Sequence, residues 1–212
     1  MKALIIGATG ATGKDLVNIL LQDPAYTEVA IFVRRPRGVS HPKLTEVITD
    51  FDKLEAVSGA ITGDILFSCL GTTLKAAGSR DNQWHIDYEI PLKFAEIAKA
   101  NGVSGVVLLS AYGASPVSKV FYSWMKGKLE EGITNLGFSQ FIIFRPGLLL
   151  RPDTDRPGER ITAGLLKFVN SLGLIRKFRP IPTATLAEKL AKSPQVSGAG
   201  THIVALDNIF RF

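Results

Sequence analysis

The chain opens with Lys2-Ala-Leu-Ile-Ile-Gly-Ala-Thr-Gly-Ala-Thr-Gly13, an apolar run that ends in three regularly spaced glycines. The run predicts a buried strand, and the pattern from Lys14 onward predicts a helix. In such a unit the first glycine permits a tight turn, the second lets backbone approach a phosphate, and the third lets the helix pack on the strand. The helix N-terminus adds N–H donors. We therefore predict a phosphate-binding turn, rather than a turn without a ligand, formed by Gly7, Thr9, Gly10, Ala11, Thr12 and Gly13.

Length and composition limit the class of protein. With 212 residues, 46% of them hydrophobic, the chain suits one α/β domain with a small appended lobe. Cys69 is the only cysteine and lies in an apolar run, so we interpret it as a core residue in a reducing compartment. The N-terminus enters a strand at once, and no stretch approaches membrane-spanning length. We expect a cytoplasmic protein with no membrane contact.

The net charge of +6 raises the question of a nucleic-acid partner. The basic residues are spread over several short clusters, with no basic helix and no interleaved aromatic residues, so we expect no nucleic-acid binding. The three histidines have no partners at metal-ligand spacing, and with a single cysteine we expect no metal site.

Apolar segments alternate with helical patterns along the chain, which is typical of βαβ units. We predict a doubly wound parallel sheet of the Rossmann type within a single domain, residues 1–212, in which 148–197 form a reduced C-terminal substrate lobe. The expected strands are 2–6, 28–33, 44–48, 65–69, 105–109, 138–144 and 202–205. The expected helices are 14–22, 54–56, 87–101, 119–134 and 161–172.

Strand two ends in Arg34-Arg35. In a dinucleotide-binding sheet this position meets the adenosine ribose, where an acid binds the 2′-hydroxyl of NAD and an arginine accommodates the 2′-phosphate of NADP. Two guanidinium groups favour the phosphate. We predict NADP(H) as the cofactor, and the alternative is a solvated basic turn.

Two further segments follow strands at the edge of the sheet where ligands bind. Asp50 and Phe51 come after the third strand. Leu70, Gly71, Thr72 and Thr73 come after the fourth strand. Each of these segments, taken alone, also fits an ordinary loop.

Ser110, Tyr122 and Lys126 form the candidate catalytic group. Ser110 ends a buried strand, and Tyr122 and Lys126 lie four residues apart on one face of the next helix. A nearby ammonium stabilises a phenolate, which lets a tyrosine exchange a proton with a carbonyl or alcohol oxygen. Ser110 would hydrogen-bond the same oxygen. The pair alone is a weak signal, but its order after the glycine turn and the serine strengthens it.

Together with Arg145-Pro-Gly147, these motifs resemble the atypical short-chain dehydrogenases/reductases, and in particular the Tat-interacting-protein-like and NmrA-like NAD(P)H-binding group. The resemblance covers the whole chain and implies NADPH as the usual cofactor. It implies that Asp50 and Phe51 lie at the adenine edge and that Leu70–Thr73 form the ribose and adenine wall. It also implies that Lys126 hydrogen-bonds the nicotinamide ribose and that Pro146 and Gly147 run beside the carboxamide.

One departure from the family pattern concerns turnover. Many active relatives have an Asn on the helix after strand four, where this chain has His85-Ile-Asp87-Tyr88, with Asp87 as the candidate substitute. Several members of the family act as regulators or sensors. Two hypotheses follow: an NADPH-dependent oxidoreductase acting on a small carbonyl or alcohol substrate, and an NADPH-binding sensor without turnover. The first needs only a small-molecule substrate, whereas the second needs a protein partner, and a homo-oligomer fits either.

Overall fold

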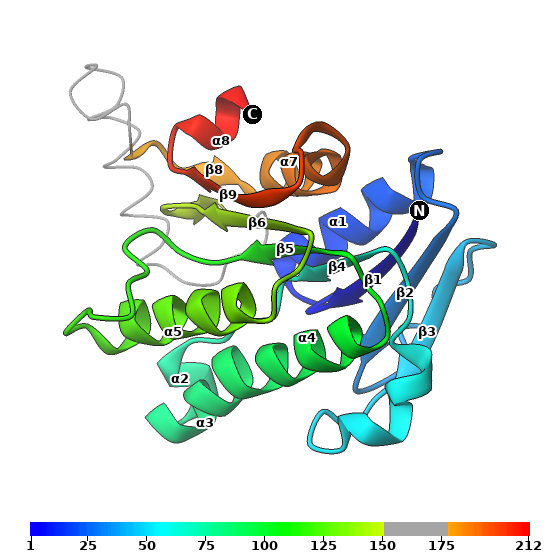
Figure 1. Ribbon diagram of the computed structural model, residues 1–212, viewed down its shortest axis with the longest axis horizontal. Coiled ribbons are helices and arrows are strands. Elements are labelled where there is room, and N and C mark those ends of the chain that lie inside the picture. Colours follow the sequence, from blue (N-terminus) through cyan, green and yellow to red (C-terminus); the bar gives the residue numbers. More distant parts are fainter. Residues whose placement is uncertain (151–177) are drawn as a thin grey trace.

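The computed structural model describes residues 1–150 and 178–212. A seven-stranded parallel sheet forms its centre, in the order β3-β2-β1-β4-β5-β6-β9 (Figure 1). The strands are β1 (Lys2–Ile6), β2 (Glu28–Val33), β3 (Leu44–Ile48), β4 (Ile65–Ser68), β5 (Gly105–Leu109), β6 (Gln140–Arg145) and β9 (Gly200–Ala205). A separate short pair joins β7 (Leu149–Leu150) to β8 (Ile181–Pro182).

The central strands are apolar on both faces because both faces are covered by helices. In β1, Ala3 and Ile5 pack into one hydrophobic core, and Leu4 and Ile6 pack into the other. This arrangement explains why the strand is a continuous apolar run rather than an alternating pattern.

Long helices cover both faces of the sheet in the described part of the chain (Figure 1). The first core is covered by α1 (Ala11–Gln22) and α7 (Thr183–Val196). The second is covered by α4 (Ile90–Ala100) and α5 (Phe121–Asn135). A buried hydrogen bond of 2.6 Å from the Tyr26 hydroxyl to the Ala191 carbonyl ties the turn after α1 to α7.

Short helical segments connect several of the strands. A 3-10 helix, η1 (Leu54–Ala60), lies between β3 and β4, and α8 (Asn208–Arg211) lies at the C-terminus. After β4 the chain forms α2 (Leu74–Ala77), α3 (Arg80–Trp84) and a π-helical turn, η2 (His85–Glu89), which runs directly into α4. A π-helical turn shifts the helical register, and such turns are frequent at functional sites.

The predicted fold class is confirmed, and the seven strands of the central sheet fall within two residues of the predicted bounds, whereas the short pair β7 and β8 was not predicted. The predicted substrate lobe, 148–197, stays a prediction, and its C-terminal part contains a helix that contributes to the main core. Residues of α7 pack against α1 in the main core, so this helix belongs to the sheet-covering layer. The two prolines of this segment are compatible with the helix, because Pro182 precedes it and Pro194 lies near its end. The helix predicted over 161–172 lies outside the described residues.

The order of the strands reverses between β1 and β4. From β1 the chain proceeds to β2 and β3 on one side, and β4, β5 and β6 continue on the other side. In open α/β sheets, ligands bind outside the carboxyl ends of the strands at such a reversal. The turn after β1 and the segment after β4 therefore mark the position of a candidate site.

Candidate functional site

The turn between β1 and α1 depends on two glycines for steric reasons. Gly7 has a positive φ of 81°, and a Cβ there would lie 2.4 Å from the Cys69 carbonyl. A Cβ on Gly13 would lie 2.1 Å from the Gly7 carbonyl oxygen. Neither position can take a side chain, so both glycines let the ends of β1, β4 and α1 approach one another.

Gly10 differs from these two glycines. Its φ of −71° suits any residue, and an added Cβ would meet only the Gly7 carbonyl oxygen, at 3.3 Å. Gly10 caps α1, whose first intrahelical bond joins the Lys14 N–H to the Gly10 carbonyl at 2.9 Å. The N–H groups of residues 11–13 precede that bond, and the first turn carries no acidic residue. These features are typical of a helix end that can bind an anion.

Two cavities open on either side of this turn. One has a volume of about 770 Å³ and is lined in part by Ser110, Tyr122 and Lys126; we call it the Tyr122 cavity. The other has a volume of about 750 Å³ and is lined in part by Arg34; we call it the Arg34 cavity. The residues common to both linings are Gly10, Cys69, Leu70, Gly71 and Thr72. The glycine turn and the segment after β4 thus form a shared rim.

The Arg34 cavity brings together several residues predicted to bind the cofactor. Thr9, Asp50 and Phe51 line it with Arg34. Arg35 is exposed and is not among the lining residues of either cavity in the described part of the chain. The structure therefore separates the two arginines, which the sequence alone treated as equivalent.

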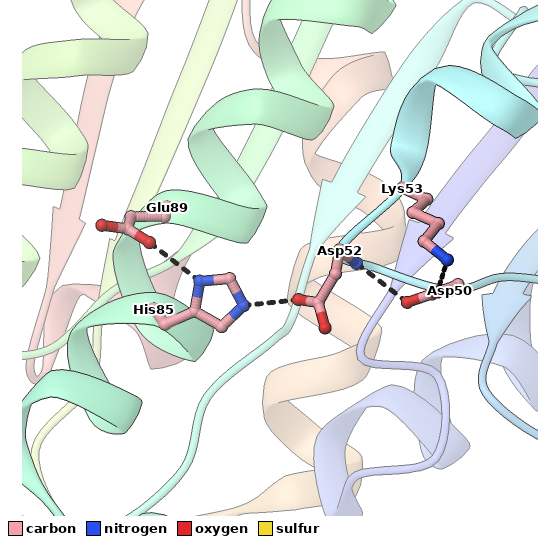
Figure 2. Close-up of polar contacts among 5 residues, drawn as sticks. All are labelled: Asp50, Asp52, Lys53, His85 and Glu89. Atoms are coloured by element: carbon pink, nitrogen blue, oxygen red, sulfur yellow. Dashed lines mark hydrogen bonds and ion pairs between the residues drawn. The ribbon is translucent and has the colours of Figure 1, made fainter.

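His85 is one of the residues that line the Arg34 cavity. Figure 2 shows its ring between the carboxylates of Glu89 and Asp52. Its Nδ1 lies 2.8 Å from Glu89 Oε2, and its Nε2 lies 2.7 Å from Asp52 Oδ1, so the ring bridges η2 to the loop after β3. Hydrogen bonds to the Glu89 and Asp52 carboxylates raise the pKa of His85 above its usual value. The described residues hold no group of three His, Cys, Asp or Glu suited to a metal.

In the Tyr122 cavity, Tyr122 and Lys126 lie one turn apart on α5. The Lys126 ammonium lies 6.0 Å from the centre of the Tyr122 ring, within cation–π range. The Lys126 side chain is only 3% exposed, whereas Tyr122 is 40% exposed. The tyrosine can thus reach a molecule in the cavity, while the lysine is held beneath it.

Asp87 is the buried partner of Lys126. Its Oδ2 lies 3.6 Å from Lys126 Nζ, and its Oδ1 accepts a 2.7 Å hydrogen bond from the Thr72 N–H. Burial raises the pKa of Asp87, and the Lys126 charge and the Thr72 bond oppose that rise. Asp87 therefore joins α5 to the segment after β4.

Ser110 lies in the wall of the Tyr122 cavity, but its hydroxyl already has a protein partner. It donates a 2.5 Å hydrogen bond to Glu130 Oε1, and Glu130 also pairs with Arg145. Sequence reasoning missed Glu130, although its position four residues after Lys126 places it on the same face of α5. It also treated Arg145 only as part of a family motif.

The remaining predicted residues have local structural partners. Thr73 caps α2 by accepting a hydrogen bond from the Ala76 N–H at 3.2 Å. The Pro146 carbonyl accepts from the Tyr112 N–H at 2.9 Å. Pro146 and Gly147 follow β6 and are not among the described residues that line the two cavities, so their predicted contact with the cofactor stays a prediction.

Comparison with known proteins identifies the family. A family described as NAD(P)H-binding matches residues 7–163. The chain belongs to this NAD(P)H-binding family. The match begins at Gly7 and spans the glycine turn, both cavities and α5, which confirms the predicted resemblance to atypical short-chain dehydrogenases/reductases.

Two curated relatives and one solved structure illustrate the family. The chain is 38% identical to "Protein fmp52, mitochondrial" of Emericella nidulans, over 79% of this chain and 76% of that protein. It is 36% identical to "Protein HTATIP2" of Rattus norvegicus, over 79% of this chain and 70% of that protein. An Agrobacterium tumefaciens short-chain dehydrogenase/reductase superfamily protein with bound NAD has the same fold, with a TM-score of 0.74 and 17% identity over 97% of this chain and 77% of that one.

The predicted cytoplasmic location is wrong by this comparison. The Emericella relative is named mitochondrial, and so are several other matched relatives. The prediction used a single cysteine and the lack of a secretory signal, and these features cannot distinguish one reducing compartment from another. No helix among the described residues is long and apolar enough to span a bilayer.

A dinucleotide suits the residues present. The N–H groups at the start of α1 can take a pyrophosphate, and the open space over Gly10 lets that group approach the backbone. The cavities on the two sides of this point can take the two halves of the cofactor.

We predict that Gly10→Val abolishes NADPH binding while the protein stays folded, because the branched side chain occupies the space of the pyrophosphate. The measurements are a fluorescence titration with NADPH and a circular dichroism spectrum. Gly198→Val, at an exposed glycine with open space around it, is the control and should bind normally. Normal NADPH affinity in the Gly10 variant would show that the turn has only a structural role.

We also predict that His85 stabilises the protein in a pH-dependent way. Because its folded pKa lies above the unfolded value, the stabilisation is present below the unfolded pKa and is lost as the pH rises through the folded pKa. Urea unfolding of wild type and His85→Gln at about pH 5.5 and about pH 9 measures this. The difference in unfolding free energy should be larger at the lower pH. Equal differences at both values would contradict the assignment.

Proposed function

We propose that this protein is an NADPH-dependent oxidoreductase that acts on a small carbonyl or alcohol substrate. The observation that carries the proposal is the position of Tyr122 and Lys126 in the wall of a cavity whose rim is the glycine turn. A substrate in this cavity could touch Tyr122 and the cofactor at the same time.

When bound, NADPH supplies a hydride. Tyr122 donates the proton that a reduced carbonyl oxygen needs, and the buried Lys126 ammonium stabilises the phenolate that remains. Asp87 holds Lys126 in place from below. Ser110 lines the same cavity, where its hydroxyl can help to orient the reacting molecule.

The structure offers no support for a competing role of Cys69, which lines both cavities. Burial raises the pKa of the Cys69 thiol to about 12, and the Lys126 charge only partly offsets this effect. The thiol is therefore neutral near pH 7 and a poor nucleophile. Among the described residues, Tyr122 is the better candidate for the chemistry.

The second candidate function is a sensor that binds NADPH and a partner protein without turnover. The observation in its favour is that the Ser110 hydroxyl hydrogen is directed to Glu130. The two functions differ in what they require of Tyr122, because a sensor needs no proton donor.

The proposal includes a preference for NADPH over NADH, which Arg34 provides from the rim of its cavity. Arg34→Ala should weaken NADPH binding about 10- to 100-fold, as expected for the loss of a charged hydrogen bond, and leave NADH binding nearly unchanged. Arg35→Ala is the matched control and should have a smaller effect. Titration of both cofactors measures the preference, and equal affinity of the wild-type protein for NADPH and NADH would disprove it.

A screen of carbonyl compounds that follows NADPH absorbance tests the function directly. With any substrate so found, Tyr122→Phe should lower turnover by about 10²- to 10⁴-fold, because the proton donor is lost, and should leave NADPH affinity unchanged. Lys126→Met should weaken both turnover and NADPH binding. Full activity of Tyr122→Phe would assign proton donation to another group. If no substrate appears and Tyr122→Phe keeps partner binding, the sensor function replaces the enzyme.

A further inference from the structure

Glu130 is a buried carboxylate that lies one helical turn beyond Lys126 on α5. It does not itself line the Tyr122 cavity. Its Oε1 accepts hydrogen bonds from the Ser110 hydroxyl at 2.5 Å and from Arg145 Nε at 3.0 Å, and its Oε2 pairs with the terminal guanidinium nitrogen of Arg145. Both carboxylate oxygens thus have donors, as a buried charge requires.

These bonds tie α5 to two neighbouring strands. Ser110 directly follows β5 and Arg145 ends β6, and the Ser110 N–H also bonds the Phe144 carbonyl at 2.8 Å. The Ser110 backbone and side chain are therefore both held from outside the cavity. Glu130 is the group that connects this pair of strand ends to the helix that carries Tyr122.

The direction of the Ser110 bond has a chemical consequence. A hydroxyl has one hydrogen and two lone pairs, and an ionised carboxylate can only accept. Arg145 can only donate, and its guanidinium donates to both Glu130 oxygens, so the carboxylate is the acceptor of the Ser110 bond as well. The single hydrogen of Ser110 must therefore point to Glu130, and only lone pairs remain for a molecule in the cavity.

We propose that Glu130 is a positioning residue that makes Ser110 a hydrogen-bond acceptor in the active site. Ser110 then binds the hydroxyl of an alcohol, or that of Tyr122, and cannot donate to a carbonyl oxygen. This specifies the hydrogen bond that the sequence predicts for Ser110, because it makes Ser110 the acceptor in that bond. The inference rests on the proposed function for its kinetic effect, and on the contacts of Glu130 for its geometry.

The direct test is a neutron structure of the unmodified protein in heavy water. We expect the Ser110 deuteron to lie between Ser110 Oγ and Glu130 Oε1, with no deuteron on the carboxylate. A deuteron on Ser110 that points into the cavity, or one on Glu130, would overturn the proposal. This test needs neither a variant nor a substrate, so its result is independent of whether the carbonyl screen succeeds.

The kinetic test releases the Ser110 hydrogen by replacing both charges of the pair, the buried Glu130 and the partly exposed Arg145, in the variant Glu130→Met with Arg145→Met. Removing the two together avoids an unpaired buried charge. With a substrate from the screen, the ratio of KM for the alcohol to KM for the carbonyl should rise about 2- to 10-fold, the usual range for one neutral hydrogen bond. The same change made in the Ser110→Ala background should leave that ratio unaltered.

If Glu130 had a purely structural role, the double substitution would change KM and kcat by the same factor in the wild-type and in the Ser110→Ala background. That result would overturn the proposal. Glu131→Gln is the matched control, because Glu131 is the adjacent residue and pairs only with Lys128 among the described residues. If the double variant does not fold, Glu130→Gln, whose amide oxygen can still accept from Ser110, should retain a ratio near that of wild type. If Tyr122→Phe had no effect on turnover, that result would count against the proposed function rather than against the role of Glu130.

Discussion

The close contact of three backbone segments organises this protein. Gly7 lies against the Cys69 carbonyl, and Gly13 lies against the Gly7 carbonyl, at distances that exclude any side chain. These contacts bring the N-terminus of α1 to the reversal point of the sheet, next to the segment after β4. One cavity lies on each side of this point, and residues of the glycine turn and of the segment after β4 line both of them. These close backbone contacts therefore place a helix N-terminus, which can bind an anion, between the two cavities.

The buried charges around α5 form two separate pairs. Lys126 pairs with Asp87 from η2, and Glu130 pairs with Arg145 from the end of β6. A buried charge is costly unless it is paired and hydrogen-bonded, so each pair fixes the position of α5 relative to a different element. The Tyr122 ring therefore projects into its cavity from a helix that is anchored on both the β4 side and the β6 side. Such fixed geometry is what a proton donor requires.

Much of the fold could be predicted from local sequence. The apolar runs that form β1 and β5, and the glycine turn, are local signals, and the structure agrees with them. The π-helical turn at His85–Glu89 and the core position of α7 were not predictable in this way. The first depends on how α3 continues into α4, and the second depends on packing with α1, which lies far away along the chain.

The candidate site, like the fold, could be predicted from the sequence only where the signal is local. Spacing predicted that Tyr122 and Lys126 share a helix face, because this follows from the helical period. It could not distinguish Arg34 from Arg35, since only the path of the chain after β2 decides which one lines a cavity. The partners of Ser110 and Lys126 were also hidden, because Glu130, Arg145 and Asp87 meet them only in the folded protein.

A crystal structure with NADP⁺ would test the central claim most directly, namely that the glycine turn holds the middle of a dinucleotide between two cavities. We predict that the pyrophosphate contacts the backbone N–H groups of residues 11–13 and that the nicotinamide lies in the Tyr122 cavity. The 2′-phosphate of the adenosine ribose should lie beside Arg34. A cofactor bound in the reverse direction, or one bound away from the N-terminus of α1, would contradict this account.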